Sequence, residues 1–101
     1  MIVGQVWEME DGSRWSVTAP GTITRVAANP PEELSITDEQ LTADAVLTSV
    51  QPGQIYNNLE TGESVTIHHL FRGTIWAVRD FLDNERLFTE QYLGTYFALA
   101  V

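Results

Sequence analysis

The stretch Gly4-Gln5-Val6-Trp7 is written a second time as Gly53-Gln54-Ile55-Tyr56, and the residues after each copy also match in order. The further matches are Gly12 with Gly62, Gly21-Thr22-Ile23 with Gly73-Thr74-Ile75, Glu33 with Glu85, Thr37 with Thr89, Leu41 with Leu93 and Leu47 with Leu99. Each change of spacing falls in a predicted turn, where insertions cost little. We therefore predict a tandem duplication of one module, with domains at 1–51 and 52–101.

Most of each module has the pattern of β-strands. In the first copy, apolar and polar residues alternate over 2–9 and 14–19, as expected for half-buried strands. Asp11-Gly12 between them predicts a hairpin, because both residues tolerate positive φ. A third strand is expected at 22–28, before a loop that contains Pro30 and Pro31.

The end of each module predicts one helical turn followed by a strand. Thr37 and Gln40 have the spacing of a capping box, so we expect a turn at 37–40 between two short strands. A helix from Asp38 to Ser49 is the alternative. In the second copy Gly94 disfavours a long helix, and 95–101 is rich in strand formers.

Five strands and a helical turn in about 50 residues resemble the small β-barrels of the Tudor and Src-homology type. The resemblance implies an all-β fold of closed barrels, and a peptide-binding aromatic groove between the first loops. Only Gln51-Pro52 separates the copies. We therefore expect them to pack as one pseudo-two-fold unit, since so small a barrel alone buries little surface.

The charge of the chain argues against several functions. Fourteen acids face five arginines and no lysine, for a net charge of −9. Phosphate backbones and anionic membranes repel such a chain, so we expect neither direct nucleic-acid binding nor membrane binding. There is no cysteine and no apolar run of the roughly 20 residues that span a bilayer. A cytoplasmic location is the default expectation.

Catalytic and metal-binding patterns are missing from the sequence. The two histidines, His68 and His69, are adjacent, and neighbours on a strand point to opposite faces. We therefore expect one inward and one outward imidazole, without a shared metal or nucleophile. No Ser-His-acid set or phosphate loop is present. We expect no enzymatic activity, no metal and no cofactor.

Two features instead predict a protein-binding function. Residues 1–51 carry eight acids and two arginines, whereas 52–101 carry six acids and three arginines. The second module also has a longer and more distinctive segment at 68–72. The candidate partner-binding residues are Glu8, Glu10, Asp11, Glu32, Glu33, Asp38, Glu39, His69, Leu70, Phe71 and Arg72.

An acidic face of this kind suits a partner protein with a basic surface. Small, acidic, cysteine-free chains are typical of phage-encoded inhibitors, including anti-CRISPR and other anti-defence proteins, so an inhibitor that blocks a nucleic-acid-binding surface is the first hypothesis. The alternatives are an assembly component that forms homo-oligomers and a protein that sequesters a small ligand between the modules.

Limited proteolysis tests the single-unit prediction. Because the connection between the copies is so short, we expect cleavage to yield no stable half-length fragment. Two halves that each persist and stay folded would contradict a single packed unit.

Overall fold

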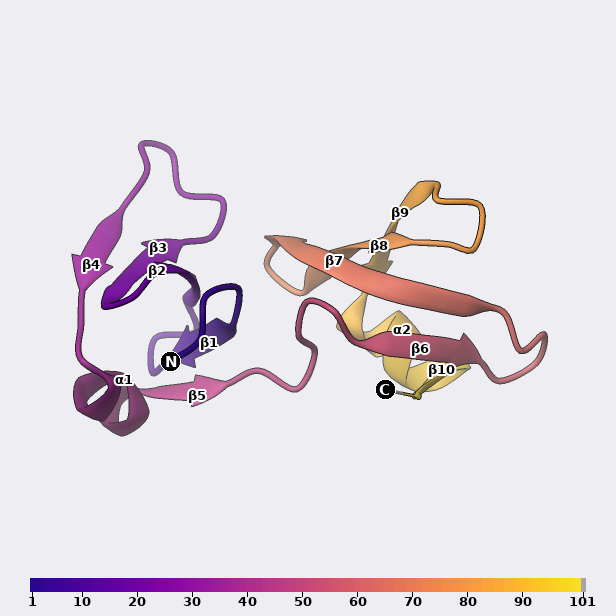
Figure 1. The fold of residues 1–101 in the computed structure, drawn as a ribbon, viewed down its shortest axis with the longest axis horizontal. Coiled ribbons are helices and arrows are strands. Elements are labelled where there is room, and N and C mark those ends of the chain that lie inside the picture. The colour runs from indigo at the N-terminus through magenta and orange to yellow at the C-terminus, as the bar shows by residue number, and fades with distance from the viewer. Residues whose placement is uncertain (101) are drawn as a thin grey trace. The chain divides into compact units, whose positions relative to one another are not determined.

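Residues 1–100 are described in the computed structural model. They form two compact units, divided between Ser49 and Val50, two residues before the predicted boundary. Each unit holds one five-stranded antiparallel sheet and one short helix (Figure 1). The packing of the units into one pseudo-two-fold body stays a prediction.

The first unit begins with a four-stranded meander. Its elements are β1 (Val6–Met9), β2 (Arg14–Ala19), β3 (Thr22–Arg25), β4 (Glu33–Ser35), α1 (Asp38–Asp44) and β5 (Ala45–Leu47). The strand order across the sheet is β4-β3-β2-β1-β5, so the chain returns from α1 to add β5 beside β1.

The second unit has the same sequence of elements. They are β6 (Ile55–Asn58), β7 (Ser64–Arg72), β8 (Ile75–Arg79), β9 (Glu85–Thr89), α2 (Glu90–Tyr96) and β10 (Phe97–Leu99). Read from β9, the strand order is β9-β8-β7-β6-β10, which repeats the order of the first unit strand for strand.

Neither sheet is a closed barrel, so that part of the prediction is wrong. In the first unit β4 and β5 are opposite edges, and in the second unit β9 and β10 are. Strands β4, β5 and β10 have only three residues each, which is little for a closing ladder. In the first unit the helix connects the two edges instead, and its Leu41 is buried with Trp15, Val17 and Ile23 of the sheet.

The repeated Gly-Gln stretch begins as a tight turn rather than inside a strand. The Gln5 N–H donates to the Ile2 carbonyl (3.1 Å), and Gly4 has φ +98°, the conformation that a type II turn requires at its third residue. The Gln5 side-chain oxygen accepts from the Ile2 N–H at 2.9 Å. Strand β1 therefore starts at Val6 and not at Ile2.

The second copy of this turn has the same bonds. Gly53 has φ +89°, and the Gln54 side-chain oxygen accepts from the Gln51 N–H at 2.8 Å. Pro52 occupies the second position of the turn, which a type II turn favours for proline. In both copies the glycine N–H and the glutamine carbonyl also bond the backbone of one residue on the second strand of the unit. This residue is Val17 on β2 in the first copy and Ile67 on β7 in the second.

The strand registers correct one part of the sequence alignment. Val17 pairs with Ile23, whereas its counterpart Ile67 pairs with Val78. Ile23 is therefore equivalent in the sheet to Val78 and not to Ile75, and both residues are fully buried. The displacement arises because the β7–β8 hairpin is longer: residues 68–77 lie between Ile67 and Val78, whereas only 18–22 lie between Val17 and Ile23. A second bulge in β7, between Leu70 and Arg72, accounts for one of the added residues.

Both helices are longer than the predicted single turn. Helix α1 ends at Asp44 and is therefore shorter than the alternative helix from Asp38 to Ser49. The capping box is confirmed, since Thr37 accepts from the Gln40 N–H and Gln40 accepts from the Thr37 N–H. Helix α2 runs through Gly94 to Tyr96, so the strand expected at 95–101 is reduced to Phe97–Leu99. Its predicted last residue, Val101, lies outside the described residues.

Two glycine substitutions in the second unit have opposite expected effects. Gly53→Ala places a side chain at φ +89° and should lower the free energy of unfolding by about 1 kcal/mol. Gly94→Ala meets no atom within 4 Å and adds helix propensity, so it should raise that energy by about 1 kcal/mol. Urea denaturation measures both.

Comparison of the two variants tests whether residue 94 is helical. If Gly94→Ala destabilised the protein as much as Gly53→Ala does, the helical conformation of residue 94 would be wrong.

Candidate functional site

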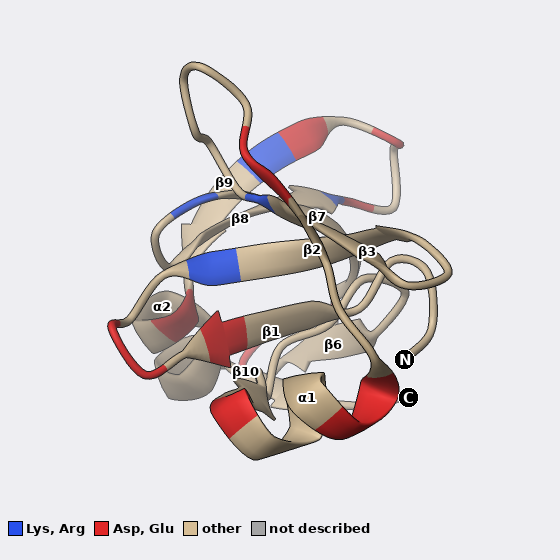
Figure 2. Cartoon of the chain, turned by 90° about the vertical axis from the view of Figure 1, so that its left-hand side faces the viewer, with Lys and Arg blue, Asp and Glu red and all other residues tan. Residues whose placement is uncertain are grey.

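The predicted acidic residues of the first unit lie in three groups rather than on one face. In Figure 2 acidic positions appear on β1, the β1–β2 turn, α1 and the region of β4. Strands β3 and β2 separate β4 from β1, a distance of about 14 Å at the usual strand spacing. Helix α1 spans about 10 Å, so its two acidic ends are also apart.

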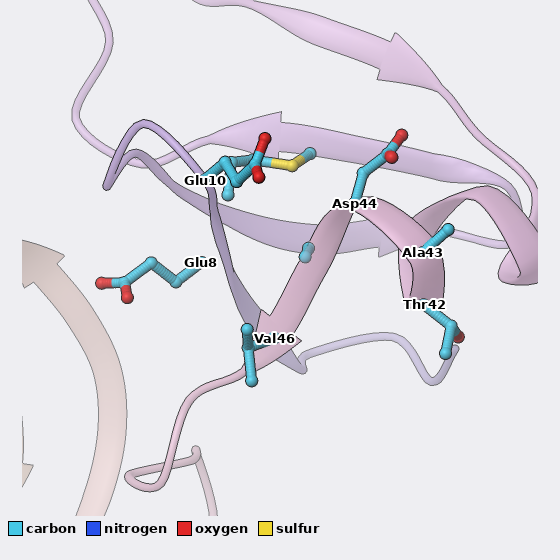
Figure 3. A pocket seen from close by; sticks show the side chains of 8 residues that line it. Glu8, Glu10, Thr42, Ala43, Asp44 and Val46 are labelled. Carbon is cyan, nitrogen blue, oxygen red and sulfur yellow. The ribbon is translucent and has the colours of Figure 1, made fainter.

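The first group surrounds a hollow of about 640 Å³ between β1 and the end of α1 (Figure 3). Its acidic lining residues are Glu8, Glu10 and Asp44, and Asp44 was not among the predicted residues. The three carboxylates point in different directions (Figure 3). Glu8 pairs with the Arg14 guanidinium at 3.1 Å, and no ion pair involves Glu10 or Asp44 within residues 1–100.

The second and third groups are partly neutralised. At the β4 edge, Glu32 lies 3.5 Å from the Arg25 guanidinium, and Glu33 is exposed. At the start of α1, Asp38 accepts from the terminal ammonium of Met1 at 2.6 Å. Glu39 is the second acid of this first helical turn, where a carboxylate interacts favourably with the positive end of the helix dipole.

Asp11 shapes the β1–β2 hairpin. Only Gly12 takes positive φ there, so the turn is a type I turn followed by an αL glycine, and not the predicted two-residue turn. The Asp11 carboxylate accepts from the Ser13 hydroxyl (2.5 Å) and backbone N–H (2.9 Å). These bonds, and more weakly Arg25, hold the pKa of Asp11 below its usual value.

The expectation of opposed histidines is wrong. The β7 register shifts between Ile67 and His69, and a bulge sets two consecutive residues against one partner, which interrupts the alternation of side chains. His68 and His69 are both exposed, and their Nδ1 atoms lie 2.6 Å apart as a hydrogen-bonded pair. One ring nitrogen must then donate and the other accept.

The remaining residues of the predicted binding segment at 68–72, which was expected to be a loop, belong to strand β7, and they divide between core and surface. Leu70 is only 6% exposed and pairs across the sheet with Trp76, so it is not available to a partner. Phe71 is 44% exposed and lies under the Arg72 guanidinium, 5.5 Å from the ring centre. These two residues lie beside the two-residue turn Gly73-Thr74.

Sequence reasoning missed two exposed apolar features of the second unit. Phe81 and Leu82 form the tip of the β8–β9 loop, although adjacent bulky residues after a strand were a usable signal. On α2, the rings of Tyr92 and Tyr96 contact each other at a tilt of 49°, with centres 4.9 Å apart, beside a shallow hollow of about 290 Å³. Their helical spacing of four residues was visible, but the segment was predicted to leave the helix before Tyr96.

The described residues offer little chemistry. No group of three or more His, Asp or Glu side chains in residues 1–100 is arranged to hold a metal ion. The carboxylates around the β1–α1 hollow diverge, whereas paired acid–base catalysis needs two that converge on one bond. None of the helices in residues 1–100 is long and apolar enough to cross a bilayer.

Comparison with family models, with curated proteins and with solved structures found no match to this chain. The function must therefore be argued from the surface of the molecule.

The Ser13→Ala variant tests the electrostatics of the first hairpin. Loss of the hydroxyl that donates to Asp11 should raise the Asp11 pKa toward its usual value. Carboxyl ¹³C NMR during a pH titration measures this change, with Ser16→Ala on β2 as the control. An unchanged Asp11 pKa in Ser13→Ala would exclude the hydroxyl as the main cause.

Proposed function

We propose that this protein is a non-enzymatic binding module whose first unit contacts a basic surface of a partner protein. The observation that carries the proposal is an imbalance of charge within that unit. Both of its arginines pair with acids, Arg14 with Glu8 and Arg25 with Glu32. Glu10, Glu33, Glu39 and Asp44 remain exposed, without a basic partner in residues 1–100.

Such carboxylates favour long-range attraction to basic proteins. Because they lie on a hairpin, at a sheet edge and on a helix, they present negative charge over an area rather than at one point. Extended complementarity of this kind accelerates association and selects the partner more than it adds affinity. The same charge disfavours nucleic acid and anionic membranes as partners.

The finer form of the proposal is an inhibitor. A chain that covers a basic nucleic-acid-binding surface would prevent that protein from binding its nucleic acid, and an inhibitor of the phage anti-defence type would act in this way. The divergence of the carboxylates around the β1–α1 hollow agrees with action by obstruction.

An assembly role is the second candidate, and the sheet edges favour it. Strands β5 and β10 are unpaired on one side and expose Val46, Leu47 and Leu99. An exposed edge strand with apolar side chains can pair with the edge of another chain. Sedimentation at high concentration separates the candidates, since a strictly monomeric protein contradicts the assembly role.

We also propose that the two units arose by duplication. The duplication is supported by the shared element order, the shared strand order and the matching turns at Gly4-Gln5 and Gly53-Gln54. A bulge at the same place in β2 and β7, after Val17 and Ile67, adds to it. The acid-rich surface of the first unit then diverged from the aromatic surface of the second.

A capture experiment tests the proposed function. Immobilised protein is incubated with nuclease-treated cell lysate at about 0.05 M and about 0.5 M salt, since the higher concentration screens charges within a few ångströms. We expect basic nucleic-acid-binding proteins to be captured at low salt and to be lost at high salt.

Charge-matched variants identify the surface. Glu10→Gln with Asp44→Asn removes two charges from the first unit and should weaken capture about tenfold. Glu60→Gln with Glu63→Gln removes two charges from the β6–β7 turn of the second unit and should leave capture unchanged. Capture that responds neither to salt nor to the first pair contradicts the proposal.

A further inference from the structure

The β8–β9 loop of the second unit presents two large apolar side chains to solvent. Phe81 is 69% exposed and Leu82 is 65% exposed. The loop extends beyond the ends of both strands in Figure 1. Two adjacent side chains of this size, exposed on one loop, form an apolar surface that favours burial against another molecule.

Hydrogen bonds around Asp80 brace the loop. The Asp80 carboxylate accepts from the N–H groups of Leu82 and Asn84, both at 2.9 Å. The Asp80 N–H donates to the Asn84 carbonyl (3.0 Å), and the Asp83 N–H donates to the Asp80 carbonyl (2.9 Å). Asp83 takes φ +62°, a conformation that aspartate tolerates better than most residues.

This order of the loop bears on binding. A preordered loop loses little conformational entropy when a partner binds it, so more of the burial energy of its side chains appears as affinity. Aromatic and aliphatic anchors that fill a pocket are the usual source of binding energy at protein interfaces. The acidic groups of the first unit supply steering, and they do not supply such an anchor.

The charges beside the tip restrict the kind of partner. Residues 79–86 contain three acids and two arginines. Arg79 lies 3.6 Å from Asp83, and the Arg86 guanidinium lies over the Phe88 ring at 5.0 Å. This pair offsets the charge of Asp83, whereas Glu85 is exposed without a basic partner in residues 1–100. Three acids against two arginines leave the rim of the tip with a net charge of −1.

This rim disfavours two other occupants. An anionic bilayer would repel it, and a second copy of a chain with net charge −9 would also do so. The acidic hollow between β1 and α1 is likewise a poor receptor for an acidic tip. A protein pocket that is apolar inside and basic at its rim matches both the side chains and the charges.

We propose that Phe81 and Leu82 are the anchor of the partner interface and insert into an apolar pocket with a basic rim on the partner protein. The inference rests on the proposed function in one respect, because it names the anchor of the same complex. It assigns steering to the first unit and burial to the β8–β9 tip.

Photo-crosslinking tests the contact directly. Phe81→benzoylphenylalanine is irradiated in cell lysate, with Leu59→benzoylphenylalanine as the control, since Leu59 is 66% exposed on a different loop of the same unit. We expect one protein to be crosslinked from position 81 and not from 59. Crosslinking to a second copy, to lipid or to nothing would overturn the proposal.

The crosslinked protein then serves as the probe in affinity measurements. Phe81→Ala with Leu82→Ala should weaken its binding roughly tenfold or more, with the salt dependence unchanged. Leu59→Ala should bind as the unmodified protein does. Since all three side chains are exposed, circular dichroism and thermal unfolding should show that every variant is folded.

The two proposals fail in different ways. If binding is salt-sensitive and weakened by Glu10→Gln with Asp44→Asn, but unaffected by Phe81→Ala with Leu82→Ala, the anchor is wrong and the proposed function stands. If binding requires the tip but responds neither to salt nor to the acidic variants, the anchor stands and the acidic surface is not the binding surface.

Discussion

The turn that precedes the first strand of each unit is the constraint on which the two sheets depend. A glycine with positive φ reverses the chain, and the glutamine after it bonds back to the first residue of the turn. The glycine N–H and the glutamine carbonyl also bond the backbone of a single residue on the second strand of the unit. Because a shift of one residue would move every side chain to the other face, this pairing places Val17 and Ile67 in the core.

The same scaffold carries two different surfaces. Equivalent positions in the two helices bury Leu41 and Leu93, so the core is maintained while the exterior changes. The first unit exposes carboxylates around β1 and α1, and the second exposes aromatic and aliphatic side chains at its loops and on α2. Long-range charge attraction and short-range apolar burial are complementary contributions to association, and the proposed complex takes the first from the first unit and the second from the β8–β9 loop.

Several features of the fold and the surface were readable from the chain. Gly-Gln pairs and matching residues along the two halves predicted two similar β-rich halves, and Thr37 with Gln40 predicted the capping box that begins α1, although only one helical turn was expected there. The excess of acids in the first half predicted its negative surface. These predictions depend on local conformational preference or on charge, which a residue carries wherever the fold places it.

Other features depend on contacts between distant residues. Closure of a sheet needs two edges to meet, and the edges of the first unit stay apart because α1 connects them and Leu41 fills its core. A bulge in β7 leaves both His68 and His69 exposed, and the longer β7–β8 hairpin makes Val78 rather than Ile75 the counterpart of Ile23. Burial of Leu70 against Trp76 and the distance of the β4 acids from those of β1 also follow from strand pairing. Such pairings join separate segments of the chain, so the pattern within one segment cannot set them.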